Sequence, residues 1–209
     1  RELHPSTGTT GHPVHTLWTT NDVQTIARFT ARLLYQAGTR PGDVVQNAFS
    51  YGLWIAGLAV HYAADLLRCL VIPIGATLTD RQIWYFQNAG TAVFLSTPSF
   101  ALHIAERMRE EVVDPASIPL RIGLFGGEGG TETEGTRAKI ETGLGIDAFD
   151  FYGISEIHPT YSGECTAKAG LHWTEDHHLI EIIDSETLRP VSEGETGILV
   201  VTHLTREAS

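Results

Sequence analysis

The chain has 209 residues, of which 42% belong to the hydrophobic set and 19% are charged. This composition can bury one sizeable core or two small ones and argues against an intrinsically disordered protein. The formal net charge of −11 disfavours nucleic-acid binding, which depends on clustered Lys and Arg side chains. The longest apolar stretch, residues 53–74, is interrupted by His61, Asp65 and Arg68, so we expect no membrane-spanning helix.

The first residue and the cysteines give two further expectations. Arg1 stands in first place without a basic region, an apolar stretch and a cleavage site in succession, which predicts an internal cut and a missing upstream segment. The two cysteines, Cys69 and Cys165, lie far apart, and Cys69 sits in an apolar stretch typical of a buried free thiol. We therefore expect a cytoplasmic protein.

Helical and extended segments alternate through most of the chain. The first helix begins near Asp22, with Asn21 or Thr20 as its predicted N-cap and Gly38 as its stop. Such alternation favours parallel strands joined by helical crossovers, with a ligand site at the carboxyl ends of the strands. The predicted helices cover 22–37, 54–67, 80–88, 99–110 and 133–142, and the predicted strands cover 44–49, 71–74, 93–95, 121–125 and 148–151.

The pattern changes after residue 152. Residues 179–184 and 198–204 have the pattern of antiparallel strands joined by turns. We therefore predict an α/β fold, in which residues 1–152 form a parallel sheet flanked by helices. Residues 153–209 are predicted to form a smaller β-rich annex of the same large domain.

A loop rich in Ser, Thr and Gly reads STGTTGHP at residues 6–13. Backbone N–H groups and hydroxyls packed in this way can surround phosphate oxygens. Only two residues separate Gly8 from Gly11, which excludes a Walker loop, because that motif has four residues between its glycines and a Lys after the second. From composition alone, an ordinary solvated connection is the alternative.

Two further loops follow predicted strands. Residues 126–129 read GGEG, and residues 150–156 read DFYGISE. Taken separately, a Tyr-Gly pair can be a packed aromatic followed by a turn, and a Ser-Glu pair can be surface or a helix start. The order of all three motifs is the more specific signal.

These three motifs resemble those of the adenylate-forming superfamily. Within it, residues 47–54, 123–128 and 170–177 (NAFSYGLW, GLFGGE and GLHWTEDH) are similar to stretches of phenylacetate-CoA ligases. The resemblance covers essentially the whole chain. It implies ATP-dependent activation of a phenylacetate-like aromatic acid to an acyl-adenylate, followed by thioester formation with coenzyme A.

The resemblance also implies a role for each motif. Ser155 and Glu156 are the predicted catalytic residues, with Ser155 at the α-phosphate and Glu156 helping to place Mg²⁺, a hard cation that prefers carboxylate oxygens. Tyr152 is predicted to stack on the adenine, next to Gly153. The remaining predicted nucleotide contacts are Ser6, Thr7, Gly8, Thr9, Thr10 and Gly11 around the phosphates, and Gly126, Gly127, Glu128 and Gly129 along the adenine.

Two candidate sites keep an alternative interpretation. Phe49, Tyr51 and Trp54 could line an aromatic slot for the acid, or they could pack as core aromatics. His158, Cys165 and His172, with two further histidines beyond, form a ligand set that zinc would accept. Their spacing matches no compact finger pattern, so a metal-free loop that shapes the site is the alternative.

The chain departs from the family pattern at two places. His12 stands where a Lys usually precedes the Pro, and a neutral imidazole brings no full positive charge to phosphate. The chain ends at Ser209, before the expected ribose-binding Asp and the C-terminal domain with its catalytic Lys, so we expect it to be incomplete for turnover. The alternatives are an adenylating enzyme that loads a carrier protein and a non-catalytic binding module that retains the fold. A homodimer is a family-level expectation.

Overall fold

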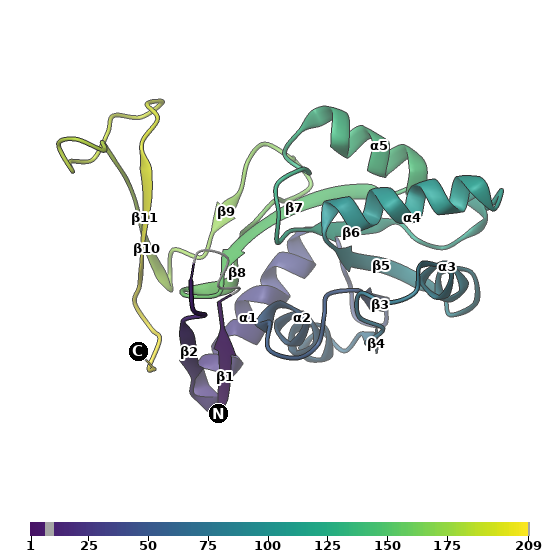
Figure 1. Cartoon of the computed structure of the whole chain (residues 1–209), viewed down its shortest axis with the longest axis horizontal. Helices are drawn as coiled ribbons and strands as arrows, with labels where there is room; N and C mark the ends of the chain where they lie inside the picture. Colours follow the sequence, from purple (N-terminus) through teal and green to yellow (C-terminus); the bar gives the residue numbers. More distant parts are fainter. Residues whose placement is uncertain (7–10, 209) are drawn as a thin grey trace.

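The computed structural model describes residues 1–6 and 11–208. Its centre is a seven-stranded sheet in the order β4-β3-β5-β6-β7-β8-β9 (Figure 1). The strands are β3 (Val44–Asn47), β4 (Leu70–Ile72), β5 (Thr91–Ser96), β6 (Ile122–Phe125), β7 (Asp147–Ile154), β8 (His158–Gly163) and β9 (His172–Trp173). The strands from β4 to β7 run parallel, whereas β8 and β9 continue the sheet antiparallel.

Helices cover both faces of this sheet, which confirms the predicted α/β fold. They are α1 (Thr20–Gln36), α2 (Ile55–Leu66), α3 (Thr79–Asn88), α4 (Pro98–Glu110) and α5 (Glu134–Leu144), with a 3₁₀ helix at Pro115–Ser117. On one face, Leu34 of α1 and Val60 of α2 belong to the same buried cluster as Leu124 of β6. On the other face, side chains of α3, α4 and α5 bury Phe94 and Phe125. The central parallel strands β5 and β6 are therefore enclosed between two layers of helix, as their apolar composition requires.

The start of α1 differs from its prediction. The N-cap is Thr19, not Thr20 or Asn21. The Thr19 hydroxyl accepts a hydrogen bond from the N–H of Asp22 (3.1 Å), and the Asp22 carboxylate accepts one from the N–H of Thr19 (2.8 Å). This reciprocal capping box satisfies two backbone donors at once, which a cap one or two residues later does not do.

Two small antiparallel pairs accompany the main sheet. Strands β1 (Glu2–Pro5) and β2 (His15–Trp18) flank the Ser-, Thr- and Gly-rich loop, and β10 (His178–Ile183) pairs with β11 (Ile198–His203). The second pair confirms the predicted antiparallel strands, and it stands to one side of the sheet in Figure 1. Strand β7 runs through residues 152 and 153, so the division of the chain at that point stays a prediction.

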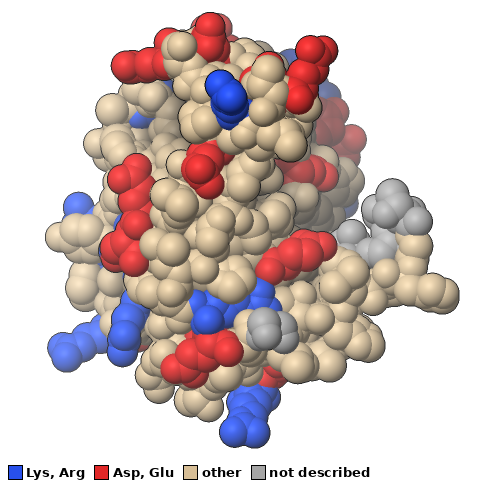
Figure 2. Space-filling model, turned by 90° about the vertical axis from the view of Figure 1, so that its left-hand side faces the viewer, with Lys and Arg blue, Asp and Glu red and all other residues tan. Residues whose placement is uncertain are grey.

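The surface carries both signs of charge. On the face that bears the β10–β11 hairpin, acidic side chains gather at the top, towards the hairpin turn, and Lys and Arg side chains are scattered (Figure 2). Within the described residues, none of the helices combines the length and hydropathy that crossing a bilayer requires.

Candidate functional site

Three loops meet at the carboxyl-terminal edge of the parallel strands, after β3, β6 and β7. Together with Ser6 they enclose a cavity of about 190 Å³. Its lining consists of Ser6, Trp54, Ala56, Gly127, Phe151, Gly153, Ile154, Ser155, Glu156 and Pro159. The structure therefore brings predicted site residues from all three sequence motifs, and one of the three predicted aromatics, to a single cavity.

Glycines allow the loop after β6 to approach its neighbours closely. A Cβ atom added to Gly126 would lie 2.6 Å from the carbonyl oxygen of Phe151, a contact that real side chains do not make. Gly127 has a φ of +86° and faces the Trp54 ring, 3.1 Å from an added Cβ. Only glycine combines this backbone conformation with these approaches, so the loop lies directly against β7 and the start of α2.

Glu128 and Gly129 lie in the same loop but do not line the cavity. The Glu128 carboxylate accepts a hydrogen bond from the backbone N–H of Ser99 (2.8 Å), in the first turn of α4. A carboxylate at a helix N-terminus satisfies an unpaired N–H group and interacts favourably with the helix dipole. Glu128 therefore holds the loop to α4, and its predicted contact with adenine stays a prediction.

Ser155 and Glu156 occupy the turn between β7 and β8. Ser155 is half-buried and Glu156 is exposed, and both line the cavity. Gly127 and Gly153 line the same cavity at this edge of the sheet. This arrangement offers an oxygen ligand for a cation next to a glycine-rich surface that can approach a phosphate group.

Tyr152 lies just outside the cavity lining. Its ring contacts Tyr161 and Trp173 edge-to-face, with centroids 5.7 and 6.3 Å apart, and the residue is 39% exposed. The two neighbours fix the ring while part of it faces solvent. Stacking of Tyr152 on a base stays a prediction that this exposure permits.

The three predicted aromatics of the acid pocket separate in the structure. Phe49 is 1% exposed and packs edge-to-face on Trp54 and Phe151, in the core beneath the cavity. The hydroxyl of Tyr51 accepts a hydrogen bond from the Asn47 amide (2.8 Å), and burial raises its pKa to about 12. Trp54 alone of the three lines the cavity, so the core interpretation describes Phe49 better.

The Ser-, Thr- and Gly-rich loop is described only at its ends. The Ser6 N–H donates to the Val14 carbonyl (2.8 Å), and the Val14 N–H donates to the Ser6 hydroxyl (3.0 Å), so the two ends are clasped together. Gly11 and His12 are exposed. The predictions for Thr7, Gly8, Thr9 and Thr10 lie outside the described residues.

A titratable carboxyl group lies behind the loops, at the end of the parallel part of β7. Burial and, after it, the negative charges of Glu164 and Glu132 raise the pKa of Asp150, while Arg137 lowers it, and the net result is a pKa of about 6. Asp150 is paired in register with Phe125, the last residue of β6. The strand edge beneath the glycine loop therefore carries a carboxyl group that exchanges its proton near neutral pH.

The predicted zinc ligands are not assembled. Nε2 of His172 lies 3.2 Å from Sγ of Cys165, whereas His158 is buried and its Nδ1 lies 2.6 Å from Nε2 of His178. Across residues 1–6 and 11–208, no group of three His, Cys, Asp or Glu side chains is arranged to hold a metal ion. The metal-free alternative fits this geometry, because the histidines pair with different partners.

The buried histidine pair predicts a pH-dependent stability. Burial, followed by the neighbouring His178 and Arg206, lowers the pKa of His158 to about 2, and burial also lowers the pKa of His178. Below pH 6.5 the unfolded chain binds protons that the folded chain excludes, so stability falls as pH falls. Between pH 7 and 5 we expect a loss of about 2 kcal/mol from His158 alone.

Thermal unfolding measured from pH 7 to 5 tests this expectation. His158→Leu removes the buried titrating group, so its unfolding temperature should depend less on pH than that of the unaltered chain. The exposed His103 provides the control, since His103→Gln should leave the pH dependence unchanged. Equal slopes for all three proteins would show that His158 binds its proton equally well in the folded and the unfolded chain.

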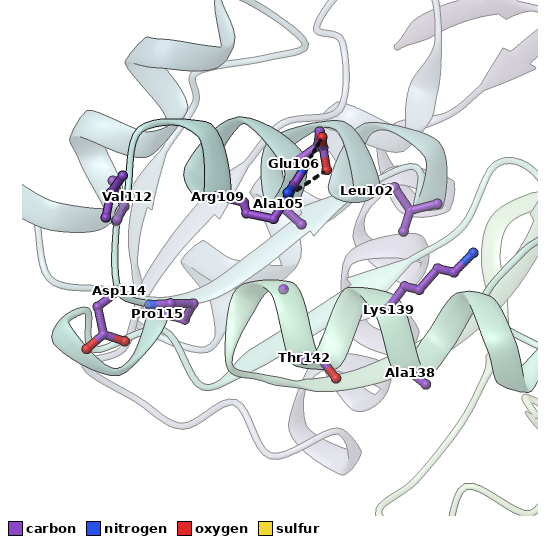
Figure 3. A pocket seen from close by; sticks show the side chains of 12 residues that line it. Leu102, Ala105, Glu106, Arg109, Val112, Asp114, Pro115, Ala138, Lys139 and Thr142 are labelled. Atoms are coloured by element: carbon purple, nitrogen blue, oxygen red, sulfur yellow. Dashed lines mark hydrogen bonds and ion pairs between the residues drawn. The ribbon is translucent and has the colours of Figure 1, made fainter.

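A larger hollow of about 880 Å³ lies between α4 and α5, away from the three loops (Figure 3). Its floor is largely apolar, including Leu102 and Ala105, and Lys139 and the Glu106–Arg109 ion pair lie along its sides. None of the residues predicted from the sequence lines it. The smaller cavity at the strand ends is therefore the candidate site.

Arg206 is a residue near the site that sequence reasoning missed. Its Nη1 donates a hydrogen bond to the carbonyl oxygen of Glu156 (2.6 Å) across 50 positions of the chain. No local spacing connects two such residues, and an isolated Arg near a chain end gave no signal. Only the folded structure brings Arg206 to the turn that carries Glu156.

No model of a known protein family matches the chain. The phenylacetate-coenzyme A ligase of Thermus thermophilus is 40% identical over 208 residues, which are 99% of this chain and 46% of that protein. The phenylacetate-coenzyme A ligase of Escherichia coli is 38% identical over 210 residues, 99% of this chain and 47% of that protein. The chain spans about half the length of the curated relatives it matches.

The chain also resembles solved structures in its fold. A 2-hydroxyisobutyryl-CoA ligase in complex with 2-HIB-AMP and CoA superimposes with a TM-score of 0.92 and 30% identity, over 99% of this chain and 44% of that one. MatB from Rhodopseudomonas palustris, with ATP bound, shares the fold with a TM-score of 0.70 and 17% identity, over 96% of this chain and 39% of that one. The fold expected from the sequence motifs is confirmed.

Proposed function

We propose that this chain, a homologue of phenylacetate-CoA ligases along its whole length, is part of an enzyme that uses ATP to join a carboxylic acid to coenzyme A. The more detailed proposal is that the acid is aromatic and phenylacetate-like, and that it passes through an acyl-adenylate. The names of the curated relatives support the acid, and a related ligase that binds an acyl-AMP and CoA supports the intermediate.

The observation that carries the proposal is the convergence of Ser6, Gly127, Gly153, Ser155 and Glu156 on one cavity at the carboxyl edge of the sheet. At about 190 Å³ this cavity is smaller than the roughly 300–1,000 Å³ of most ligand pockets. It therefore encloses only part of a nucleotide, and we propose that the remainder lies over the exposed part of Tyr152.

The chemistry requires this kind of site. Attack of a carboxylate on the α-phosphorus of ATP brings two anions together, so the protein has to align them and offset their charge. We propose that the glycine-rich backbone contacts the nucleotide, that the Ser155 hydroxyl donates to the α-phosphate, and that the exposed Glu156 carboxylate holds Mg²⁺. The carboxylate oxygens of Glu156 and its exposed position suit a hard cation such as Mg²⁺. When bound, this cation would neutralise phosphate charge.

Replacing Glu156 with alanine tests this assignment. We expect ATP to bind the unaltered chain in the presence of Mg²⁺, and we expect Glu156→Ala to weaken that binding by about tenfold or more, because a contact to a charged group is lost. Calorimetric titration with ATP, in Mg²⁺ and in a chelator, measures both affinities, and repeating it with phenylacetate present examines the acid.

The control is Glu193→Ala, which removes the same charge from an exposed position beside the β10–β11 hairpin. This variant should bind ATP as the unaltered chain does. If the unaltered chain bound ATP equally with and without Mg²⁺, or if Glu156→Ala had no effect, Glu156 would not be the cation ligand.

A further inference from the structure

Arg206 connects the turn that carries Glu156 to the N-terminal part of the chain. Its Nη1 donates to the Glu156 carbonyl oxygen (2.6 Å) and its Nη2 donates to the Leu17 carbonyl oxygen (3.0 Å). Its guanidinium carbon lies 4.0 Å from the centre of the Trp18 ring. Trp18 is itself 1% exposed, so the guanidinium plane is held between a rigid aromatic surface and two backbone acceptors.

The segment around Arg206 is anchored on the first turn of α1. The carboxylate of Asp22, which is 1% exposed, accepts hydrogen bonds from the N–H groups of Glu207 (2.8 Å) and Ala208 (3.2 Å) as well as capping the helix. Burial raises the pKa of Asp22, but these backbone hydrogen bonds outweigh burial, so its pKa lies below the usual value. The ionised Asp22 carboxylate thus holds the backbone of Glu207 and Ala208 to the first turn of α1.

The Glu207 side chain adds a second attachment at the same place. Its carboxylate accepts hydrogen bonds from the Thr19 hydroxyl (2.7 Å) and the Asn21 amide (2.9 Å). Arg206 therefore extends from a fixed backbone towards the turn between β7 and β8. These contacts with the start of α1 hold the Arg206 backbone in place independently of the bond to the Glu156 carbonyl.

The geometry points to Arg206 as a positioning residue that fixes the turn of residues 154–157 for Mg²⁺-dependent nucleotide binding. The inference rests on the proposed function of Glu156. The turn has one internal backbone hydrogen bond, from the Ile157 N–H to the Ile154 carbonyl (3.2 Å). Arg206 adds the bond to the Glu156 carbonyl, so it restrains the residue whose carboxylate is proposed to hold the cation.

Arg206→Met tests this role, because methionine keeps an unbranched apolar stem over Trp18 and removes both donors. We expect the Mg²⁺-dependent affinity for ATP to fall by about tenfold, the effect of losing a hydrogen bond made by a charged group. Affinity for ATP measured in a chelator should stay unchanged, since Arg206 acts through the cation ligand. Lysine cannot bridge two carbonyl groups in one plane, so the Mg²⁺-dependent affinity of Arg206→Lys for ATP should lie between those of the unaltered chain and Arg206→Met.

A double variant distinguishes positioning from a general loss of structure. If Arg206 acts through Glu156, adding Arg206→Met to Glu156→Ala should cause no further loss of affinity. The control is Arg32→Met, which removes an arginine paired with Asp176 at an exposed position, and it should bind ATP normally. Equal losses by Arg206→Met with and without Mg²⁺, or additive losses in the double variant, would overturn the inference.

Amide hydrogen exchange at Ile157 gives a measurement that needs no nucleotide. Arg206→Met should speed this exchange by about tenfold, because the turn loses its outer restraint while its internal bond remains. Unchanged exchange would overturn the positioning role. If the unaltered chain bound no ATP, the proposed function would fail, and the Ile157 exchange would still decide whether Arg206 holds the turn.

Discussion

Replacing Arg137 with methionine is expected to lower the free energy of unfolding by about 3–5 kcal/mol, because a buried carboxylate then loses its counterion. The Arg137 guanidinium donates to both carboxylate oxygens of Glu164 at 2.8 Å, and the two side chains are 15% and 6% exposed. It also donates to the carbonyl oxygens of Thr131 and Ala148, both at 3.0 Å. Water cannot replace so many buried contacts at once.

The consequence extends to the candidate site, because Glu164 also accepts a hydrogen bond from the N–H of Asp150 (2.8 Å). Without Arg137, the negative charge of Glu164 acts on Asp150 without the opposing positive charge of the guanidinium. The pKa of Asp150, already raised to about 6, should therefore rise further. Arg137 thus holds the end of β7 in place as well as stabilising the core.

Chemical unfolding in urea measures the effect of Arg137→Met. Adding Glu164→Gln to Arg137→Met should recover part of the loss, since the buried charge is removed along with its partner. The exposed Arg32, paired with Asp176, is the control, and Arg32→Met should change stability by less than about 0.5 kcal/mol. A loss for Arg137→Met as small as that for Arg32→Met would mean that Glu164 is solvated.

The α/β part of the fold could be predicted because its core is apolar and periodic. The buried side chains of α1, such as Ile26, Phe29 and Leu33, recur at helical spacing, and strands such as β5 and β6 are short apolar runs between helices. Strand β8 follows a different rule. All six residues of β8, HPTYSG, are buried, but most of them are polar or small. The strand therefore has no hydrophobic pattern by which it could be predicted.

The candidate site was predictable to the extent that its residues stand in contiguous motifs. The loops at 126–129 and 150–156 follow strands, and the parallel topology carries both to one edge of the sheet. Contacts between distant segments were not predictable. The bond from Ser99 to Glu128 and the bond from Arg206 to Glu156 each depend on backbone that is close only in the folded chain.

Gly153→Ala is expected to disrupt the candidate site and to lower the free energy of unfolding by about 3 kcal/mol, the upper range for forcing an extra carbon into a packed interior. An added Cβ would lie 2.0 Å from the carbonyl oxygen of Pro159 and 2.6 Å from the N–H nitrogen of Thr160. Both are backbone atoms of β8, which cannot move aside as a flexible side chain can. Gly153 therefore sets how closely β7 and β8 approach.

The close approach at Gly153 lies next to the candidate site, so we expect Gly153→Ala to weaken ATP binding as well as stability. The register between β7 and β8 shifts between Tyr152 and Ile154, so Gly153 lies where the two strands diverge into the turn that carries Ser155 and Glu156. Separating the strands there moves both side chains relative to Gly127. We expect Mg²⁺-dependent binding of ATP to be lost in Gly153→Ala even at temperatures where the variant is folded.

Gly135→Ala is the matched control, because the same carbon added in the first turn of α5 meets nothing within 4 Å. Alanine is the better helix former by about 1 kcal/mol, so this variant should be as stable as the unaltered chain or more stable. Thermal unfolding and ATP titration of the two variants compare the effect of the added carbon on stability and on ATP affinity at the two positions. If both bound ATP and unfolded like the unaltered chain, β7 and β8 would not be in contact at Gly153, and the turn would owe its shape to Arg206 and the internal Ile157 bond alone.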